Sequence, residues 1–161
     1  MDEKRYGPED LQLVGPGLDF IRTHPQMFLD EQPARSEELL ERVTWEAAQF
    51  GVVTHLEQRD DFVAVSGSPD WIADDERWFT GLSAAPEYGR NSFRQVVLLT
   101  AFCTVVATCS SKQPTPKVFV GELTNPQERW LSEALSTAAR VIAFGPPVVA
   151  SDGDHNAGGV L

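Results

Sequence analysis

Apolar residues recur along the chain with two periods, and each period predicts one kind of element. Residues 18–21 form an apolar turn of helix, which His24-Pro25 ends because the residue before a proline is pushed out of the α region. A second helix, of about four turns, is predicted to begin at Ser36 and to end at Gly51. Its apolar residues recur at helical spacing: Leu39, Leu40, Val43, Ala47 and Phe50.

Alternating and β-branched residues predict strands in the segments that follow. Residues 52–57 and 62–66 read as two strands, and the polar residues 58–61 between them predict an antiparallel hairpin. A third strand is predicted at 118–123. Asn125-Pro126-Gln127-Glu128 reads as a capping box that starts a helix running from Pro126 to about Ala138. Residues 140–144 are either the end of that helix or a further strand, and their β-branched residues favour the strand.

The middle of the chain is predicted to contain a long connection and a buried helix. Residues 71–90 show no clean period and read as a connection with one short helix. Asn91-Ser92 caps a helix over 93–110, which is apolar on nearly all sides and therefore buried. Cys103 and Cys109 lie six apart on this helix and point to different faces, so buried free thiols are expected.

The order of these elements predicts an α+β fold, a two-layer sandwich with helices on one face of a mixed sheet. A chain of 161 residues allows one domain. We expect a polar arm over 1–16, the domain itself over 17–150, and a disordered tail over 151–161, which is rich in Gly, Asp and Asn.

The net charge of the chain limits the classes of molecule that it is expected to bind. Thirteen Lys and Arg stand against 24 Asp and Glu, which gives a net charge of −11. Such a chain repels nucleic-acid phosphates, because non-specific binding needs a basic face. The charged start lacks the apolar core of a signal peptide, and the longest apolar stretch, 96–107, is shorter than the ~20 residues that span a bilayer. We therefore expect a cytoplasmic protein that binds neither nucleic acid nor membrane.

Several segments, taken in order, carry a family resemblance. Residues 17–29 are similar to Gly-Leu-x-x-Val-Arg-x-Arg-Pro-Gly-Met-Tyr-Ile, residues 43–50 to a helix with Glu-x-x-Asp-Asn, and residues 63–72 to a strand that runs into Asp-Gly-Arg-Gly-Ile-Pro. Residues 91–94 are similar to Asn-Ser-Tyr-Lys, 103–107 to Ser-Val-Val-Asn, and 140–146 to Val-x-Phe-x-Pro. Together they resemble the N-terminal ATPase domain of DNA gyrase B, whose superfamily includes histidine kinases and MutL. The resemblance implies a gyrase-like ATPase fold.

The same resemblance implies that the catalytic residues are degenerate. Glu46 stands where the family has the general base, Gln49 replaces an Asp, and Phe50 replaces the Asn that coordinates Mg²⁺. A phenyl ring offers no oxygen to Mg²⁺, and phosphoryl transfer depends on the metal and on positioning. Glu46 is therefore read as a vestigial or structural acid, with a solvated surface acid as the ordinary alternative, and no catalytic residue is expected.

The nucleotide-binding residues of the family are also replaced. Asp70 falls about two positions later than the adenine-binding Asp, and Trp71 stands where a glycine is expected. Bulky residues over 96–102 replace the glycines that would let backbone N–H groups approach phosphates. We expect the buried helix to fill the former pocket, so that no cofactor binds; Mg-ATP is kept as the alternative.

The resulting functional hypothesis is a pseudoenzyme, a non-catalytic module that binds a protein, with a basic partner suited to the acidic surface. One alternative is a nucleotide-binding domain or weak ATPase that uses Glu46 and Asp70. Asn91 completes the set of candidate nucleotide-binding residues, with Gln49 and Phe50. Another alternative is a remodelled pocket for an apolar ligand, lined by Val96, Leu99, Phe50 and Trp71.

Aromatic residues and histidines complete the candidates. Trp71 and Trp78 are candidate interface residues that could form an exposed patch, and Trp45 and Trp130 read as core or interface aromatics. The histidines share no motif, and no metal site is predicted from them: His24, His55 and His155.

Overall fold

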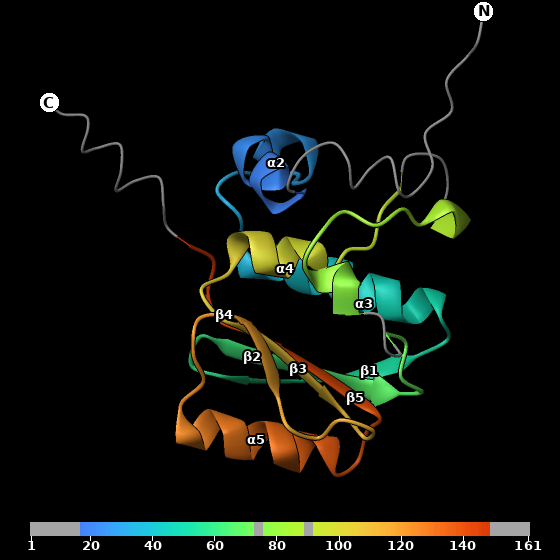
Figure 1. The fold of residues 1–161 in the computed structure, drawn as a ribbon, viewed down its shortest axis with the longest axis vertical. Coiled ribbons are helices and arrows are strands. Elements are labelled where there is room, and N and C mark those ends of the chain that lie inside the picture. The colour runs from blue at the N-terminus through green and yellow to red at the C-terminus, as the bar shows by residue number, and fades with distance from the viewer. Residues whose placement is uncertain (1–16, 73–75, 89–91, 149–161) are drawn as a thin grey trace, which may run out of the picture.

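A computed structural model describes residues 17–72, 76–88 and 92–148 (Figure 1). The predicted arm over 1–16 and the tail over 151–161 lie outside the described residues, as do Asn91 and His155. The helices of the described part are α2 (Gly17–Thr23), α3 (Ser36–Gln49), α4 (Val97–Phe102) and α5 (Asn125–Leu135), with short 3₁₀ turns η1 (Pro25–Met27), η2 (Glu76–Phe79) and η3 (Pro86–Tyr88). The strands are β1 (Val53–Arg59), β2 (Phe62–Ser68), β3 (Val106–Ser110), β4 (Lys117–Val120) and β5 (Arg140–Phe144).

The strands form one sheet in the order β1-β2-β5-β3-β4, and every neighbouring pair is antiparallel. The α+β class is therefore confirmed, whereas the expected mixed sheet is wrong. The last strand of the described chain, β5, lies in the middle of the sheet, between β2 and β3, and runs antiparallel to both.

Helices cover both faces of this sheet, so the expectation of helices on one face is also wrong. Figure 1 shows α3 and α4 on one side of the sheet and α5 on the other. The reason is that β2, β3 and β5 are buried along their length, and a sheet that is apolar on both faces needs a covering layer on each. Alternate residues of β5 point to two cores: Ile142 and Phe144 toward α3 and α4, Val141 and Ala143 toward Trp130 of α5.

The helix expected over 93–110 is wrong in its extent. The chain is helical only from Val97 to Phe102 and then becomes β3 at Val106. A strand that is buried on both faces has the same continuous apolar run as a buried helix, so periodicity does not separate them. Cys103 therefore lies at the C-terminal cap of α4 and Cys109 lies on β3, so the prediction that both belong to one helix is wrong. The prediction that both thiols are free and buried is confirmed.

The remaining local predictions are mostly confirmed. The α2 helix ends before Pro25, α3 begins at Ser36, the hairpin of β1 and β2 forms, and residues 140–144 are a strand. The capping box begins one residue earlier than predicted, at Thr124, whose hydroxyl accepts from the Gln127 N–H while the Gln127 side chain accepts from the Thr124 N–H. The connection after Trp71 carries two 3₁₀ turns where one short helix was expected.

Candidate functional site

The candidate base, Glu46, lies inside the protein. It is on the core-facing side of α3 and has no exposed surface. Its Oε2 accepts a hydrogen bond from the Tyr88 hydroxyl at 2.6 Å, and its Oε1 accepts from the Gln95 backbone N–H at 2.9 Å. The reading of Glu46 as a solvated surface acid is therefore wrong.

Two opposing effects act on the Glu46 carboxyl. Burial raises its pKa above the ordinary 4.5, and the hydrogen bonds from Tyr88 and Gln95 together with the Arg94 charge oppose that rise. The closest Arg94 nitrogen is 4.0 Å from Oε2. A raised pKa is one property of catalytic acids, but this carboxyl has no face open to a substrate.

A cage of three aromatic rings surrounds the Arg94 guanidinium, which lies beside Glu46. The Arg94 guanidinium carbon lies 4.2 Å from the ring centre of Trp78, 5.3 Å from that of Tyr88 and 5.5 Å from that of Phe50. Phe50 and Trp78 stack on each other with ring centres 6.2 Å apart. Arg94 also binds Glu87 of η3 at 2.5 Å and the Tyr88 hydroxyl at 3.0 Å. The chain's own arginine thus occupies the cation position of this cage.

The second candidate carboxylate, Asp70, is bound by an arginine of β5. Both Asp70 oxygens accept hydrogen bonds from Arg140, from Nε and Nη2, each at 2.8 Å. Oδ1 also accepts the Ile72 N–H at 3.0 Å. Arg140 is almost fully buried and donates as well to the Thr108 hydroxyl at 3.0 Å. The bidentate pair joins the end of the β1–β2 hairpin to the centre of the sheet.

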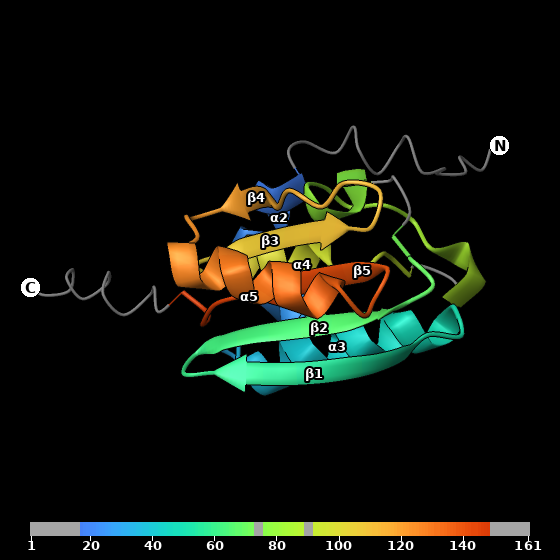
Figure 2. The same cartoon turned by 90° about the horizontal axis from the view of Figure 1, so that it is seen from below.

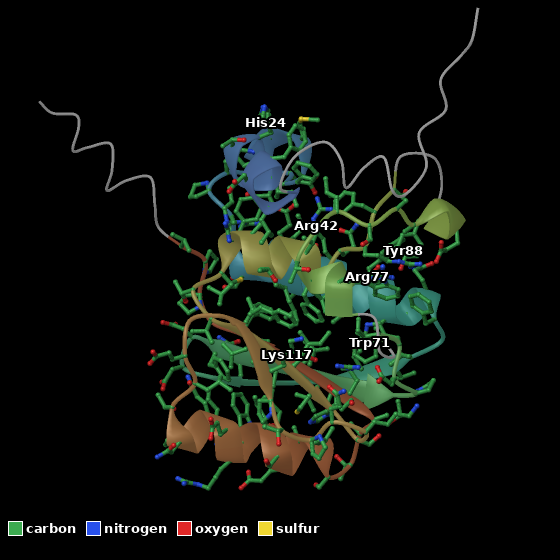
Figure 3. All side chains as sticks on the ribbon, in the orientation of Figure 1. His24, Arg42, Trp71, Arg77, Tyr88 and Lys117 are labelled. Atoms are coloured by element: carbon green, nitrogen blue, oxygen red, sulfur yellow. The ribbon has the colours of Figure 1, made fainter. Side chains whose placement is uncertain are left out.

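The other candidates lie apart from these two carboxylates or within the core. Gln49 is exposed and donates to the Trp45 carbonyl in its own helix. Trp71 is only 4% exposed, so the expected surface patch with Trp78 is wrong; Figure 3 places it between α3 and the sheet. It belongs there to the core cluster that also holds Val52 and Val65.

Residues 96–99, which the resemblance would place at a phosphate loop, belong to the core. Val96, Val97, Leu98 and Leu99 are at most 1% exposed and pack among the residues of α2, α3 and β2. Of the set expected to line an apolar pocket, Val96, Leu99 and Trp71 are core residues, while Phe50 is 37% exposed and belongs to the Arg94 cage.

An open hollow of about 630 Å³ lies beside α3, on the side of Trp45. Its lining consists of three acids, one arginine, one indole and one amide: Asp30, Glu38, Glu41, Arg42, Trp45 and Gln95. Arg42, labelled in Figure 3, donates to Glu38 at 2.8 and 3.0 Å and to the Gln95 amide oxygen at 3.2 Å, which builds the floor. Asp30 and Glu41 are exposed, and Trp45 is 46% exposed.

The sequence offered no signal for most of these partners. Tyr88 and Gln95 are more than 40 positions from Glu46, and Arg140 is 70 positions from Asp70. Arg94 and Arg140 both lay within segments of the family resemblance, 91–94 and 140–146, but no role was predicted for either. A buried acid on α3 was detectable in principle, because Glu46 falls on the apolar stripe with Val43 and Ala47.

The described residues were also compared with what a metal site and a membrane-spanning helix require. Among them, no group of three or more His, Cys, Asp or Glu side chains could hold a metal ion. No helix in the described part of the chain has the length and apolar character to cross a membrane.

The described residues form an α+β protein in which Glu46 and Asp70 are bound by the chain's own groups and an acidic hollow lies beside α3. No protein-family model matches the chain, and neither the curated proteins nor the solved structures include a match.

Proposed function

We propose that this protein is a non-catalytic module that binds a basic segment of another protein. The observation that carries the proposal is that both candidate carboxylates are bound by the chain's own groups, Glu46 by Tyr88 and Gln95, and Asp70 by Arg140. A base must reach a proton on its substrate, and an adenine-binding acid must have a free oxygen. Glu46 has no exposed surface, and both Asp70 oxygens already accept hydrogen bonds from Arg140, which supports the proposal.

We further propose that the chain is a degenerate relative of the gyrase B ATPase domain. Support comes from the order of the resembling segments and from the replacement of the Mg²⁺ ligand by Phe50, whose ring packs on Trp78. In this proposal the core residues 96–99 occupy the volume that a nucleotide would need.

The acidic hollow is the proposed docking place. A lysine or arginine of the partner can lie on the exposed Trp45 ring while Glu41 and Asp30 face its charge. The Trp45 ring is held edge-on to Tyr88, with ring centres 4.9 Å apart, so it is already ordered before binding. The net charge of −11 adds long-range attraction for a basic partner.

The test uses a fluorescein-labelled octalysine peptide and fluorescence anisotropy with the full chain. Binding that weakens with salt is expected. Trp45→Ala should weaken it about two- to fivefold, the equivalent of ~0.5–1 kcal/mol for an exposed cation–π contact. Glu41→Lys should weaken it more than Glu133→Lys, a charge reversal of equal size on the exposed face of α5, on the other side of the sheet.

Two results would contradict the proposal. Equal losses for Glu41→Lys and Glu133→Lys would show that only the net charge attracts the peptide. A rise in melting temperature with millimolar Mg-ATP would instead favour the nucleotide-binding alternative, because a ligand at a hundred times its Kd adds ~2.7 kcal/mol.

A further inference from the structure

The strand β1 forms one outer edge of the sheet, and its second side pairs with no other strand of the described residues (Figure 2). It is seven residues long and pairs with β2 in an unbroken register from Val53 to Arg59. The opposite edge, β4, has four residues and a register shift against β3. Of the two edges, β1 is therefore the long and regular one.

The hairpin turn determines which backbone groups of β1 face outward. Arg59 and Phe62 flank a two-residue turn, and in such a hairpin the flanking pair exchanges both backbone hydrogen bonds. Hydrogen-bonded and non-hydrogen-bonded pairs then alternate along the strand. The N–H and C=O groups that point away from β2 are consequently those of Thr54, Leu56 and Gln58.

Several of the usual protections of a sheet edge are missing from β1, although it carries the charged residues Glu57 and Arg59. The strand contains no proline and no bulge. Figure 2 shows α5 over the middle of the sheet, from where its Trp130 contacts the Glu57 and Arg59 side chains of β1 without pairing with the strand backbone. Two apolar side chains remain in solvent, Val53 at 89% and Leu56 at 45% exposure.

Two copies of β1 can pair antiparallel with Leu56 at the two-fold axis, and the residues that then face each other are complementary. In that register Thr54 faces the partner's Gln58, and Leu56 faces the partner's Leu56, each as a hydrogen-bonded pair that uses the outward groups. His55 faces the partner's Glu57 as a non-hydrogen-bonded pair, in which side chains approach most closely. In a single chain His55 already lies 3.4 Å from its own Glu57, on the same face of the strand.

Charge does not oppose this pairing locally, although the chain carries −11 overall. With His55 neutral, Glu57 and Arg59 cancel within the strand. The acids of the turn, Asp60 and Asp61, fall opposite the uncharged Val52 and Gly51 of the partner in the same register.

We propose that a second copy of this chain pairs with β1, forming a homodimer in which two five-stranded sheets join into one. About six backbone hydrogen bonds would form across the two-fold axis, two for each hydrogen-bonded pair. This interface goes beyond the proposed peptide-binding function and uses a different surface from the acidic hollow. A second copy is favoured over an unrelated strand because the pairing places Glu57 opposite the partner's His55 and Arg59 opposite the uncharged Val53, so that no like charges face each other.

Sedimentation velocity on the full chain tests the proposal. Wild-type protein should shift with concentration from 17.8 kDa toward twice that mass. Leu56→Pro should remain monomeric, because it removes an outward N–H while leaving the bonds to β2, and its circular dichroism reports whether it folds. Leu56→Val keeps the N–H and is the matched control that should still dimerise.

A second variant keeps the proposal testable where Leu56→Pro does not fold. His55→Glu would place four carboxylates around the axis and should raise the dimer Kd at least tenfold, whereas His55→Gln should change it little. A wild-type chain that stays at 17.8 kDa up to millimolar concentration would overturn the proposal. So would a dimer that forms equally well in His55→Glu and, where it folds, in Leu56→Pro.

Discussion

Replacing Asp70 by Ala tests whether this carboxylate belongs to the structure or to a ligand site. Asp70→Ala removes both oxygens that Arg140 binds at 2.8 Å, together with the acceptor of the Ile72 N–H. The Arg140 side chain is 3% exposed, whereas that of Asp70 is 20% exposed. The substitution therefore removes the carboxylate that binds the buried Arg140 guanidinium through two hydrogen bonds.

The expected loss follows from this burial. Removing one member of a buried ion pair costs about 3–5 kcal/mol, because the other charge stays desolvated. We expect the lower end, about 3 kcal/mol, since Arg140 keeps its bond to Thr108 and Asp70 is partly solvated. For a chain of 161 residues that loss lowers the melting temperature by roughly 6–12 °C.

The assay is urea unfolding followed by circular dichroism, with the slope m compared between variants to check that only stability changes. Asp70→Asn keeps the shape and one acceptor, so it should lose about half as much. Asp61→Ala is the matched control, because it removes the same charge from the exposed turn of the hairpin and should stay within about 0.5 kcal/mol of the wild type. An Asp70→Ala loss no larger than that of Asp61→Ala would refute the structural role of the pair.

Three further predictions concern other parts of the chain. The wild-type protein should lose a component of stability as the pH rises above 4.5, because native Glu46 still holds a proton that the unfolded chain has released; Glu46→Gln should remove that component from the pH dependence of urea unfolding. Burial raises the pKa of Cys103 to about 12 and that of Cys109 to about 11, so both thiols should react with Ellman's reagent at pH 8 only after unfolding, and fast native reaction would contradict this. Gly121→Ala should cost more than about 1 kcal/mol in urea unfolding, because Gly121 has φ of +73° and a Cβ there would lie 2.4 Å from the Thr104 carbonyl oxygen; an unchanged midpoint would contradict it.

Local sequence determined the elements whose signals are short-range. The start of α3 at Ser36, the end of α2 before Pro25 and the β1–β2 hairpin follow from capping, proline sterics and alternation, which act within a few residues. The buried state of both cysteines also followed from residue type. The same reasoning failed over 93–110, because an apolar run is compatible with a buried helix and with a buried strand.

Only the tertiary structure decided the strand order of the sheet and which groups bind the candidate carboxylates. The entry of β5 between β2 and β3 made the sheet antiparallel and gave it two apolar faces, which α5 then had to cover. The same return of the chain brought Arg140 to Asp70, and the η3 turn brought Tyr88 to Glu46. The sequence by itself supplied two candidate acids and a resemblance to a family pattern. Whether each acid is free to bind a ligand or is bound within the protein depends on partners 42 to 70 residues away, which no local rule specifies.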